Sequence, residues 1–297
     1  MTGQMTAPNS DLRNKINQHL NTFLTSDTPK EVPLNLMRWD LSHTNLESSF
    51  LRGANMRHSN AIDTEFYASN LIKADLSGSD CSRAGFGRAH MAHISLHGSK
   101  LHRVDLKDAD CHGAIMDYVL MTRSVLTDAD LVEANLARSD LQNTMADRVK
   151  LNFANCSNTW FMGSHLNHGE FIGADMRGCD LRWSNLKGAN LEKADLRGAW
   201  IEGCELTGAL LDKALFDPGV LDSIIESHRI VPLGVEFYGW TTVHDNLVKL
   251  EIPPEASRIG GLSGRQCRAS KAVVSKIYTA TGQAINGPLW SGQTIYE

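Results

Sequence analysis

The chain has 297 residues, of which 42% are hydrophobic and 21% charged, with a formal net charge of −5. These values exclude a globally disordered or collagen-like chain, and the near balance of 29 basic and 34 acidic residues argues against direct nucleic-acid binding. No apolar run is long enough for a membrane span, and the N-terminus lacks the pattern of a signal peptide. We therefore expect a cytoplasmic protein, and at roughly 150 residues per domain about two domains.

The N-terminal segment, residues 1–33, contains one predicted helix. Between residues 10 and 25 apolar side chains recur at helical spacing on roughly one face, and Ser10 is a suitable N-cap. These apolar residues are Leu12, Ile16, Leu20, Phe23 and Leu24.

From Leu36 to Phe216 the sequence repeats every five residues without an insertion or a deletion. We number the unit from one to five, with residues 34–38 as the first copy. At the third position 32 of 37 residues are Leu, Met, Phe or Ile, and the first position is nearly always small. A period of five fits neither a helix nor a straight strand.

The spacing of the small and large residues predicts a coiled backbone. Residues two apart in an extended chain point to the same side, but the next inward residue is three positions on, so a bend must fall between repeats. Eleven of the 24 glycines occupy the fifth position, where a corner needs permissive backbone. Repeated bends of one sense wind the chain into a coil, and the period alone leaves three-faced and four-faced coils open.

Several units, such as residues 74–78 (ADLSG), 134–138 (ANLAR), 189–193 (ANLEK) and 194–198 (ADLRG), closely resemble the A(D/N)LXX unit of the pentapeptide-repeat family. The resemblance implies an all-β solenoid over residues 34–217, a right-handed quadrilateral β-helix with twenty residues per coil. About nine coils follow, and at roughly 4.8 Å per coil the rod is on the order of 45 Å long. Because a solenoid exposes its core and a strand edge at each end, we expect the helix in residues 10–25 to cap the first coil.

Residues 218–297 begin within a turn signal, Asp217-Pro218-Gly219, and show no repeat from residue 220 on, so we expect a separate small α+β domain. Its strand candidates are Val235 to Thr242, Leu247 to Ile252 and Val273 to Tyr278.

The stretch from residue 250 (LEIP) through 264–265 (GR) and 267–269 (CRA) resembles a small uncharacterised domain appended to pentapeptide-repeat proteins of bacteria and bacteriophages. The resemblance implies a bacterial or phage origin. In that family the domain runs further than Glu297, so we expect a short or clipped copy here.

The cysteines and histidines predict neither catalysis nor metal binding. Five cysteines (Cys81, Cys111, Cys156, Cys179 and Cys204) fall in inward positions, where a reduced thiol acts as a small hydrophobic side chain. Cys267, between Arg265 and Arg268, is a nucleophile candidate without a nearby His partner. The histidines His90, His93, His97, His102 and His112 fall in outward positions of different faces and should not converge on a zinc ion.

The glycine-rich run at 85–90 breaks the dinucleotide fingerprint at its third glycine. We predict no enzyme, cofactor or metal site, and leave an enzyme in residues 220–297 as an alternative.

The face that contains Leu41 is the candidate interaction surface. A coil of this length stacks Arg83, Arg103 and Arg123 over one another, with Lys100 nearby, which is repulsive unless partner anions or Asp80 offset the charge. Further along, the same face carries Trp160, Met162, Arg182, Trp183 and Trp200 in outward positions. Such a patch marks an interface, and its occupant is left open between residues 220–297, a second copy of the chain in a homodimer, and a foreign protein.

These features predict a non-catalytic protein-interaction module, a rigid rod that inhibits or modulates a cellular protein, with a host protein as a target if the origin is a phage. The family resemblance implies an alternative, a DNA mimic that modulates DNA gyrase or another type II topoisomerase. The rod has a net charge of only −5, and the arginine ladder would repel a basic DNA-binding groove.

Overall fold

The computed structural model describes residues 34–218, Val220 and the backbone of six strands between 237 and 295. The chain divides into two compact units, Met1–Asp217 and Pro218–Glu297, and each is described by itself. The helix predicted for residues 10–25 lies outside the described residues.

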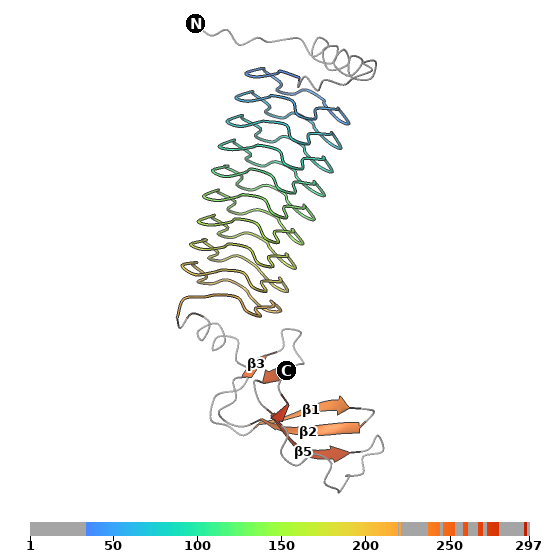
Figure 1. Ribbon diagram of the computed structural model, residues 1–297, viewed down its shortest axis with the longest axis vertical. Coiled ribbons are helices and arrows are strands. Elements are labelled where there is room, and N and C mark those ends of the chain that lie inside the picture. Colours follow the sequence, from blue (N-terminus) through green and yellow to red (C-terminus); the bar gives the residue numbers. More distant parts are fainter. Residues whose placement is uncertain are drawn as a thin grey trace. The chain divides into compact units, whose positions relative to one another are not determined.

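The first unit is a stack of closely similar coils (Figure 1). Every fifth residue from Asn35 to Asp195 forms a parallel β-bridge with the residue 20 positions later. Around each bridge the main chain pairs on both sides: Leu76 N–H donates to Ser95 O at 2.8 Å, and Ser95 N–H donates to Ala74 O at 2.9 Å. Four repeats thus complete one turn of the coil, which selects the four-faced geometry.

Each repeat ends in a tight turn at its fourth and fifth positions. The amide of the next first position donates back to the third position, as from Ser79 N to Leu76 O at 3.1 Å. Every fifth-position residue from Arg38 to Lys213 has a positive φ, between 53° and 88°. Eleven of these residues are glycine, which confirms the predicted corner, but 25 carry side chains in the left-handed region that L-residues disfavour.

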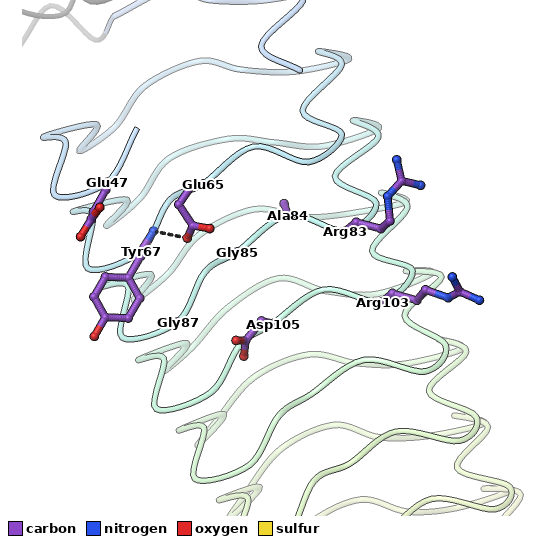
Figure 2. A pocket seen from close by; sticks show the side chains of 9 residues that line it. All are labelled: Glu47, Glu65, Tyr67, Arg83, Ala84, Gly85, Gly87, Arg103 and Asp105. Carbon is purple, nitrogen blue, oxygen red and sulfur yellow. Dashed lines mark hydrogen bonds between the residues drawn. The ribbon is translucent and has the colours of Figure 1, made fainter. Parts of the chain in front are cut away.

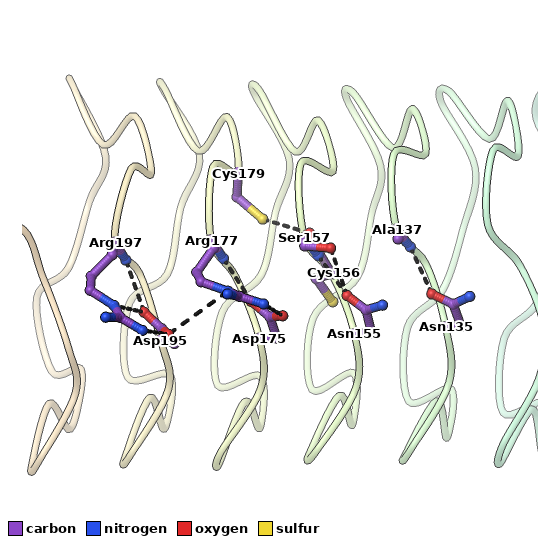
Figure 3. A network of polar contacts seen from close by, with 10 residues as sticks. All are labelled: Asn135, Ala137, Asn155, Cys156, Ser157, Asp175, Arg177, Cys179, Asp195 and Arg197. Carbon is purple, nitrogen blue, oxygen red and sulfur yellow. Dashed lines mark hydrogen bonds and ion pairs between the residues drawn. The ribbon is translucent and has the colours of Figure 1, made fainter.

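The preference for Asp or Asn at the second position has a local cause. The side-chain oxygen accepts a hydrogen bond from the amide two residues on, as from Ser77 N to Asp75 Oδ1 at 2.9 Å, and so holds the start of the turn. Figure 3 shows the same bond in successive coils at Asn135, Asn155, Asp175 and Asp195. At the two aspartates, Oδ1 also accepts a hydrogen bond from the guanidinium of the same arginine that donates its amide.

The interior of the coil is filled by the third-position side chains. From Leu36 to Leu196 each of them is buried, at most 3% exposed. Rings stack where aromatic residues occupy the same position of two successive coils: Phe66 and Phe86 lie with centroids 4.9 Å apart at an angle of 3°. At the C-terminal end Ile201, Leu211 and Phe216 are only half-buried, because fewer coils follow.

The second unit contains two small antiparallel sheets. Strands β1 (Phe237–Val243), β2 (Asn246–Ile252), β5 (Ala272–Tyr278) and β6 (Thr294–Ile295) form one sheet in the order β1-β2-β5-β6. Strands β3 (Arg258–Gly260) and β4 (Cys267–Ala269) form the other. The three long strands coincide with the predicted ones within two residues at each end, and the short strands were not predicted.

Candidate interaction surface on the Leu41 face

The Leu41 face, made of residues 39–43 and their equivalents in every later coil, carries a regular ladder at its second position. Its successive residues from residue 120 are Leu120, Asp140, Trp160, Asp180 and Trp200, linked by β-bridges. The apolar members are exposed, by 42% for Leu120, 54% for Trp160 and 59% for Trp200. The ladder therefore presents large apolar side chains on every second coil, with a carboxylate between them.

Trp200 is held in place by an arginine. Arg182 Nε and Nη2 donate to Asp180 Oδ1 and Oδ2 at 2.9 and 2.6 Å, a bidentate pair. The Arg182 Cζ atom lies 4.6 Å from the centre of the Trp200 ring, within the range of a cation–π contact. The guanidinium, through its hydrogen bonds, holds the pKa of Asp180 below its ordinary value, and the carboxylate raises the pKa of Arg182.

Trp183 and Met162, the other two residues predicted for this end of the face, lie beside Arg182 and Trp200. Trp183, 66% exposed, occupies the fifth position, and its ring lies over Gly203 of the next coil, where a methyl group would overlap it. Met162, at the fourth position, is half-buried. The structure thus brings Asp180, Arg182 and Trp200 into contact and places Trp160 in the same column.

The arginine ladder is only partly neutralised, and by a different residue from the one expected. Arg83 binds Asp63, one coil earlier, with Nε to Oδ1 at 2.7 Å and Nη2 to Oδ2 at 2.5 Å. This pair lowers the pKa of Asp63, whereas Asp80 Oδ2 lies 3.4 Å from Lys100 Nζ. Arg103 and Arg123 have no carboxylate within ion-pair distance among residues 34–218. They form a cationic stretch in the middle of the face.

A hollow of about 510 Å³ lies next to the arginine ladder (Figure 2). It forms where Gly85 and Gly87 leave two outward positions of one coil without side chains. Glu65 and Tyr67 from the preceding coil lean over these glycines. Arg83 and Arg103 line its edge, but Figure 2 shows both guanidinium groups pointing away from Glu65 and Asp105. The glycine-rich run that breaks the dinucleotide fingerprint is therefore an open, polar notch.

The rod cysteines are free thiols inside the coil, and four of the five are buried. Burial raises the pKa of Cys179 to about 12 and that of half-buried Cys204 to about 11. Among the histidines, His93 and His112 lie edge to face with centroids 5.7 Å apart. Within the described residues no group of three His, Cys, Asp or Glu side chains is placed to hold a metal ion. The described part of the chain also has no helix of sufficient length and hydropathy to span a membrane.

Two residues of this surface were missed from the sequence. Asp63 was not considered as the partner of Arg83, although the twenty-residue coil places both in one column, because the bidentate contact depends on side-chain rotamers that the sequence does not give. Leu120 was overlooked because its relation to Trp160 and Trp200 is a recurrence at every second coil within one column.

Comparison with known proteins agrees with the fold. Pentapeptide repeats match in eight copies over residues 40–78, 105–143, 129–168, 147–182 and 174–212, and a family of unknown function, DUF5758, matches residues 227–296. No curated protein matches the chain.

Solved structures similar to this chain are pentapeptide repeat proteins or share their fold. A trypsin-treated form of QnrB1, a plasmid-mediated fluoroquinolone resistance protein, is 15% identical with a TM-score of 0.53, over 64% of this chain and 95% of QnrB1. HetL from the cyanobacterium Nostoc sp. strain PCC 7120, a protein involved in heterocyst differentiation regulation, is 24% identical with a TM-score of 0.35, over 73% of this chain and 99% of HetL. The chain therefore belongs to the pentapeptide repeat family, whose fold is a right-handed β-helical solenoid, and ends in a domain of unknown function.

Proposed function

We propose that this protein is a non-catalytic protein-interaction module whose rod binds, and thereby inhibits or modulates, a cellular protein in the cytoplasm of a bacterium or a phage-infected host. The observation that carries the proposal is the exposed cluster of Trp160, Trp200 and Arg182 on one face. Trp and Arg are the residue types that contribute most to binding energy at protein interfaces. Large exposed apolar patches are rare on proteins that bind nothing.

The cluster is also pre-ordered for binding. Arg182 is fixed by two hydrogen bonds to Asp180 and in turn contacts the Trp200 ring. A side chain that is already held in one rotamer loses little conformational entropy when a partner docks, which otherwise costs about 0.5 to 1.5 kcal/mol for each long side chain. The backbone beneath is a continuous β-bridged stack, so the surface can act as a rigid template.

The chemistry of the rod supports display rather than reaction. Its thiols lie in the core with raised pKa values, as at Cys179 and Cys204, which disfavours the reactive thiolate. Cys267 lies in β4 of the second unit, and nothing is described of its side chain. The enzyme alternative is tested by Cys267→Ala, which would abolish any turnover that depends on this thiol.

The proposal is tested by affinity capture from bacterial lysate with the intact chain and with a Trp160→Ala/Trp200→Ala variant. We expect a stoichiometric protein partner to be retained by the wild type and lost by the variant. Phe153→Ala is the matched control, because Phe153 is 64% exposed but lies on the face that contains Leu51. Retention that is unaffected by the tryptophans, or lost equally with Phe153→Ala, would contradict the proposal.

A DNA-mimicking modulator of DNA gyrase or another type II topoisomerase is the second candidate. Its support is the fold likeness to QnrB1. The electrostatics favour it less, because acidic residues at the second position, including Asp175, Asp180 and Asp195, bind arginines of their own repeats. A supercoiling assay decides: inhibition or protection of gyrase by stoichiometric protein would favour the mimic, and unchanged supercoiling would exclude it.

A further inference from the structure

The apolar side chains at the second position of the Leu41 face have a regular spacing that limits what can bind them. Leu120, Trp160 and Trp200 are each separated by two coils. Strands of neighbouring coils lie about 4.8 Å apart, so the three side chains project at steps of about 9.6 Å along the rod. A partner that contacts all three must offer apolar side chains at a similar interval.

An α-helix meets this requirement and an extended strand does not. Seven residues of a helix rise about 10.5 Å, within about 1 Å of the two-coil step. Side chains on one face of a strand recur about every 6.7 Å, and neither this distance nor its double equals the step. The interval therefore favours a helix laid along the rod, with one apolar residue of each heptad on each apolar side chain of the ladder.

The charges beside the ladder define the flanks of such a helix. Arg103 and Arg123 lie at the fifth position of the same face and have no ion-pair partner among residues 34–218, unlike Arg83 and Arg182. Two uncompensated cations stacked on adjacent coils repel each other. Acidic side chains on the facing flank of a bound helix would relieve this repulsion.

We propose that the Leu41 face binds an amphipathic α-helix of a partner protein, with heptad-spaced apolar residues on Leu120, Trp160 and Trp200 and acidic residues facing Arg103 and Arg123. This inference rests on the proposed function, since it names the partner class for the same surface. Trp200, already oriented by Arg182, supplies the rigid end of the platform. The carboxylate of Asp140, which has no ion pair among the described residues, lies in the ladder between Leu120 and Trp160 and offers a site for a basic residue between two apolar contacts of the helix.

The test is selection from a displayed library of random 21-residue peptides on the intact, immobilised protein. We expect the selected peptides to carry apolar residues at intervals of seven, with Asp or Glu beside them. Their circular dichroism should show an increase in helix content on binding. Trp160→Ala and Trp200→Ala should each weaken the binding of these peptides by about tenfold, and Arg103→Glu/Arg123→Glu should weaken that of the acidic peptides, whereas Phe153→Ala should not. Thermal unfolding checks that each variant is folded, as expected for exposed positions.

The remaining outcomes separate this inference from the proposed function. Selected peptides with apolar residues at alternate positions that still require Trp160 and Trp200 would overturn the helix and leave the interaction module standing. If no peptide is selected, or if the selected peptides bind equally well without Trp160 and Trp200, both the helix and the interaction module are overturned. Light scattering tests a second copy as the occupant: a dimer that Trp160→Ala converts to a monomer would overturn the foreign helix. Loosening of residues 220–297 by Trp183→Glu, seen by proteolysis, would identify the chain's own domain as the occupant.

Discussion

At the residue scale, the fifth position of each repeat combines a fixed backbone with a variable side chain. All of its residues from Arg38 to Lys213 have a positive φ, whether glycine or not. The side chain can reach across to the next coil, as Trp183 does over Gly203. The same position therefore sets the corner of the coil and displays side chains to solvent.

Reciprocal substitutions at the fifth position should change stability in opposite directions. Gly98 has a φ of +63°, and a methyl group on its Cα would meet no neighbour within 4 Å, so Gly98→Ala introduces only backbone strain. We expect it to lower the free energy of unfolding by about 1 to 2 kcal/mol. Ala68, with a φ of 53°, is already strained, and Ala68→Gly should raise the same free energy by up to about 1 kcal/mol. Chemical denaturation of both variants is the measurement, and equal shifts of one sign would contradict this account.

The buried thiols should make the rod sensitive to alkaline pH. An unfolded thiol ionises at about pH 8.5, whereas the pKa of Cys179 in the folded rod is about 12. The folded state holds the proton more tightly, so its stabilisation is complete below the unfolded pKa and is lost as the pH rises from about 8.5 through 12. We expect Cys179→Ala to lower the free energy of unfolding modestly at pH 7, because the buried Sγ donates to Cys156 O at 2.9 Å, and to lose less of its free energy of unfolding than the wild type on going to pH 10.

The control for this prediction is Cys204→Ala. Cys204 is half-buried and its pKa is raised to about 11, so its removal should flatten the loss of stability up to pH 10 by nearly the same amount as Cys179→Ala, and by less only above about pH 11, where the Cys204 thiol ionises in the folded rod. Denaturant titrations at pH 7, 9, 10 and about 11.5 give the comparison. Parallel pH profiles for the wild type and Cys179→Ala would show that this thiol is not the cause.

At the scale of the element, hydroxyl groups at the first position tie each coil to the preceding one. Ser79 Oγ donates to Met56 O at 2.8 Å and accepts from Ser59 N at 3.1 Å. The same donation from residue i to residue i−23 recurs at Ser139 and Ser164. Serine and threonine at the first position are thus polar residues of the core whose bonds are satisfied by neighbouring coils.

Ser69 departs from this arrangement and gives a sharp test. Its Oγ is the one buried side-chain polar atom of the described residues without a hydrogen-bond partner. Ser69→Ala should therefore raise the free energy of unfolding by about 1 kcal/mol, because a buried hydroxyl without a partner carries an uncompensated desolvation cost. Ser79→Ala, at an equivalent position whose hydroxyl makes three hydrogen bonds, should lower the free energy of unfolding by a similar amount. Chemical denaturation of both variants is the measurement. If both substitutions stabilise the protein, the role given to the hydroxyls is wrong.

At the scale of the whole molecule, the sequence predicts the rod well because one local rule governs each repeat. Burial of the third position and glycine at the corner followed from the five-residue period alone. The number of faces did not, because it depends on the turn angle and enters only through the family resemblance and the observed bridges. In the second unit the three seven-residue strands were predicted, whereas β3, β4 and β6 are too short to show a pattern.

The candidate surface was predicted in part. Outward positions and stacking identified the tryptophans and arginines, but not which carboxylates they bind. The pairing of Arg83 with Asp63 and of Arg182 with Asp180 depends on side-chain rotamers across and within coils. The periodic ladder that includes Leu120 becomes visible only after all faces are aligned coil by coil.

Because the coils are interchangeable, the spacing of the surface can itself be changed. Each coil contacts only its neighbours, so removal of one whole coil should rejoin the β-bridged stack with every column in register. Deleting residues 125–144 would place Trp160 one coil from Leu120 and move it about 4.8 Å closer to Arg103 and Arg123. We expect this variant to stay folded and to bind its partner at least about tenfold more weakly, measured by titration calorimetry.

The matched control deletes residues 35–54, a coil that lies outside the span from Leu120 to Trp200. It removes the same length of chain, keeps the ion pair of Arg83 with Asp63, and leaves the intervals of the apolar ladder and its distance from Arg103 and Arg123 unchanged. This variant should bind like the wild type. If both deletions bind alike, recognition does not depend on the two-coil spacing, since a partner that contacts a single coil tolerates either change, whereas a partner that spans three apolar side chains tolerates only the second.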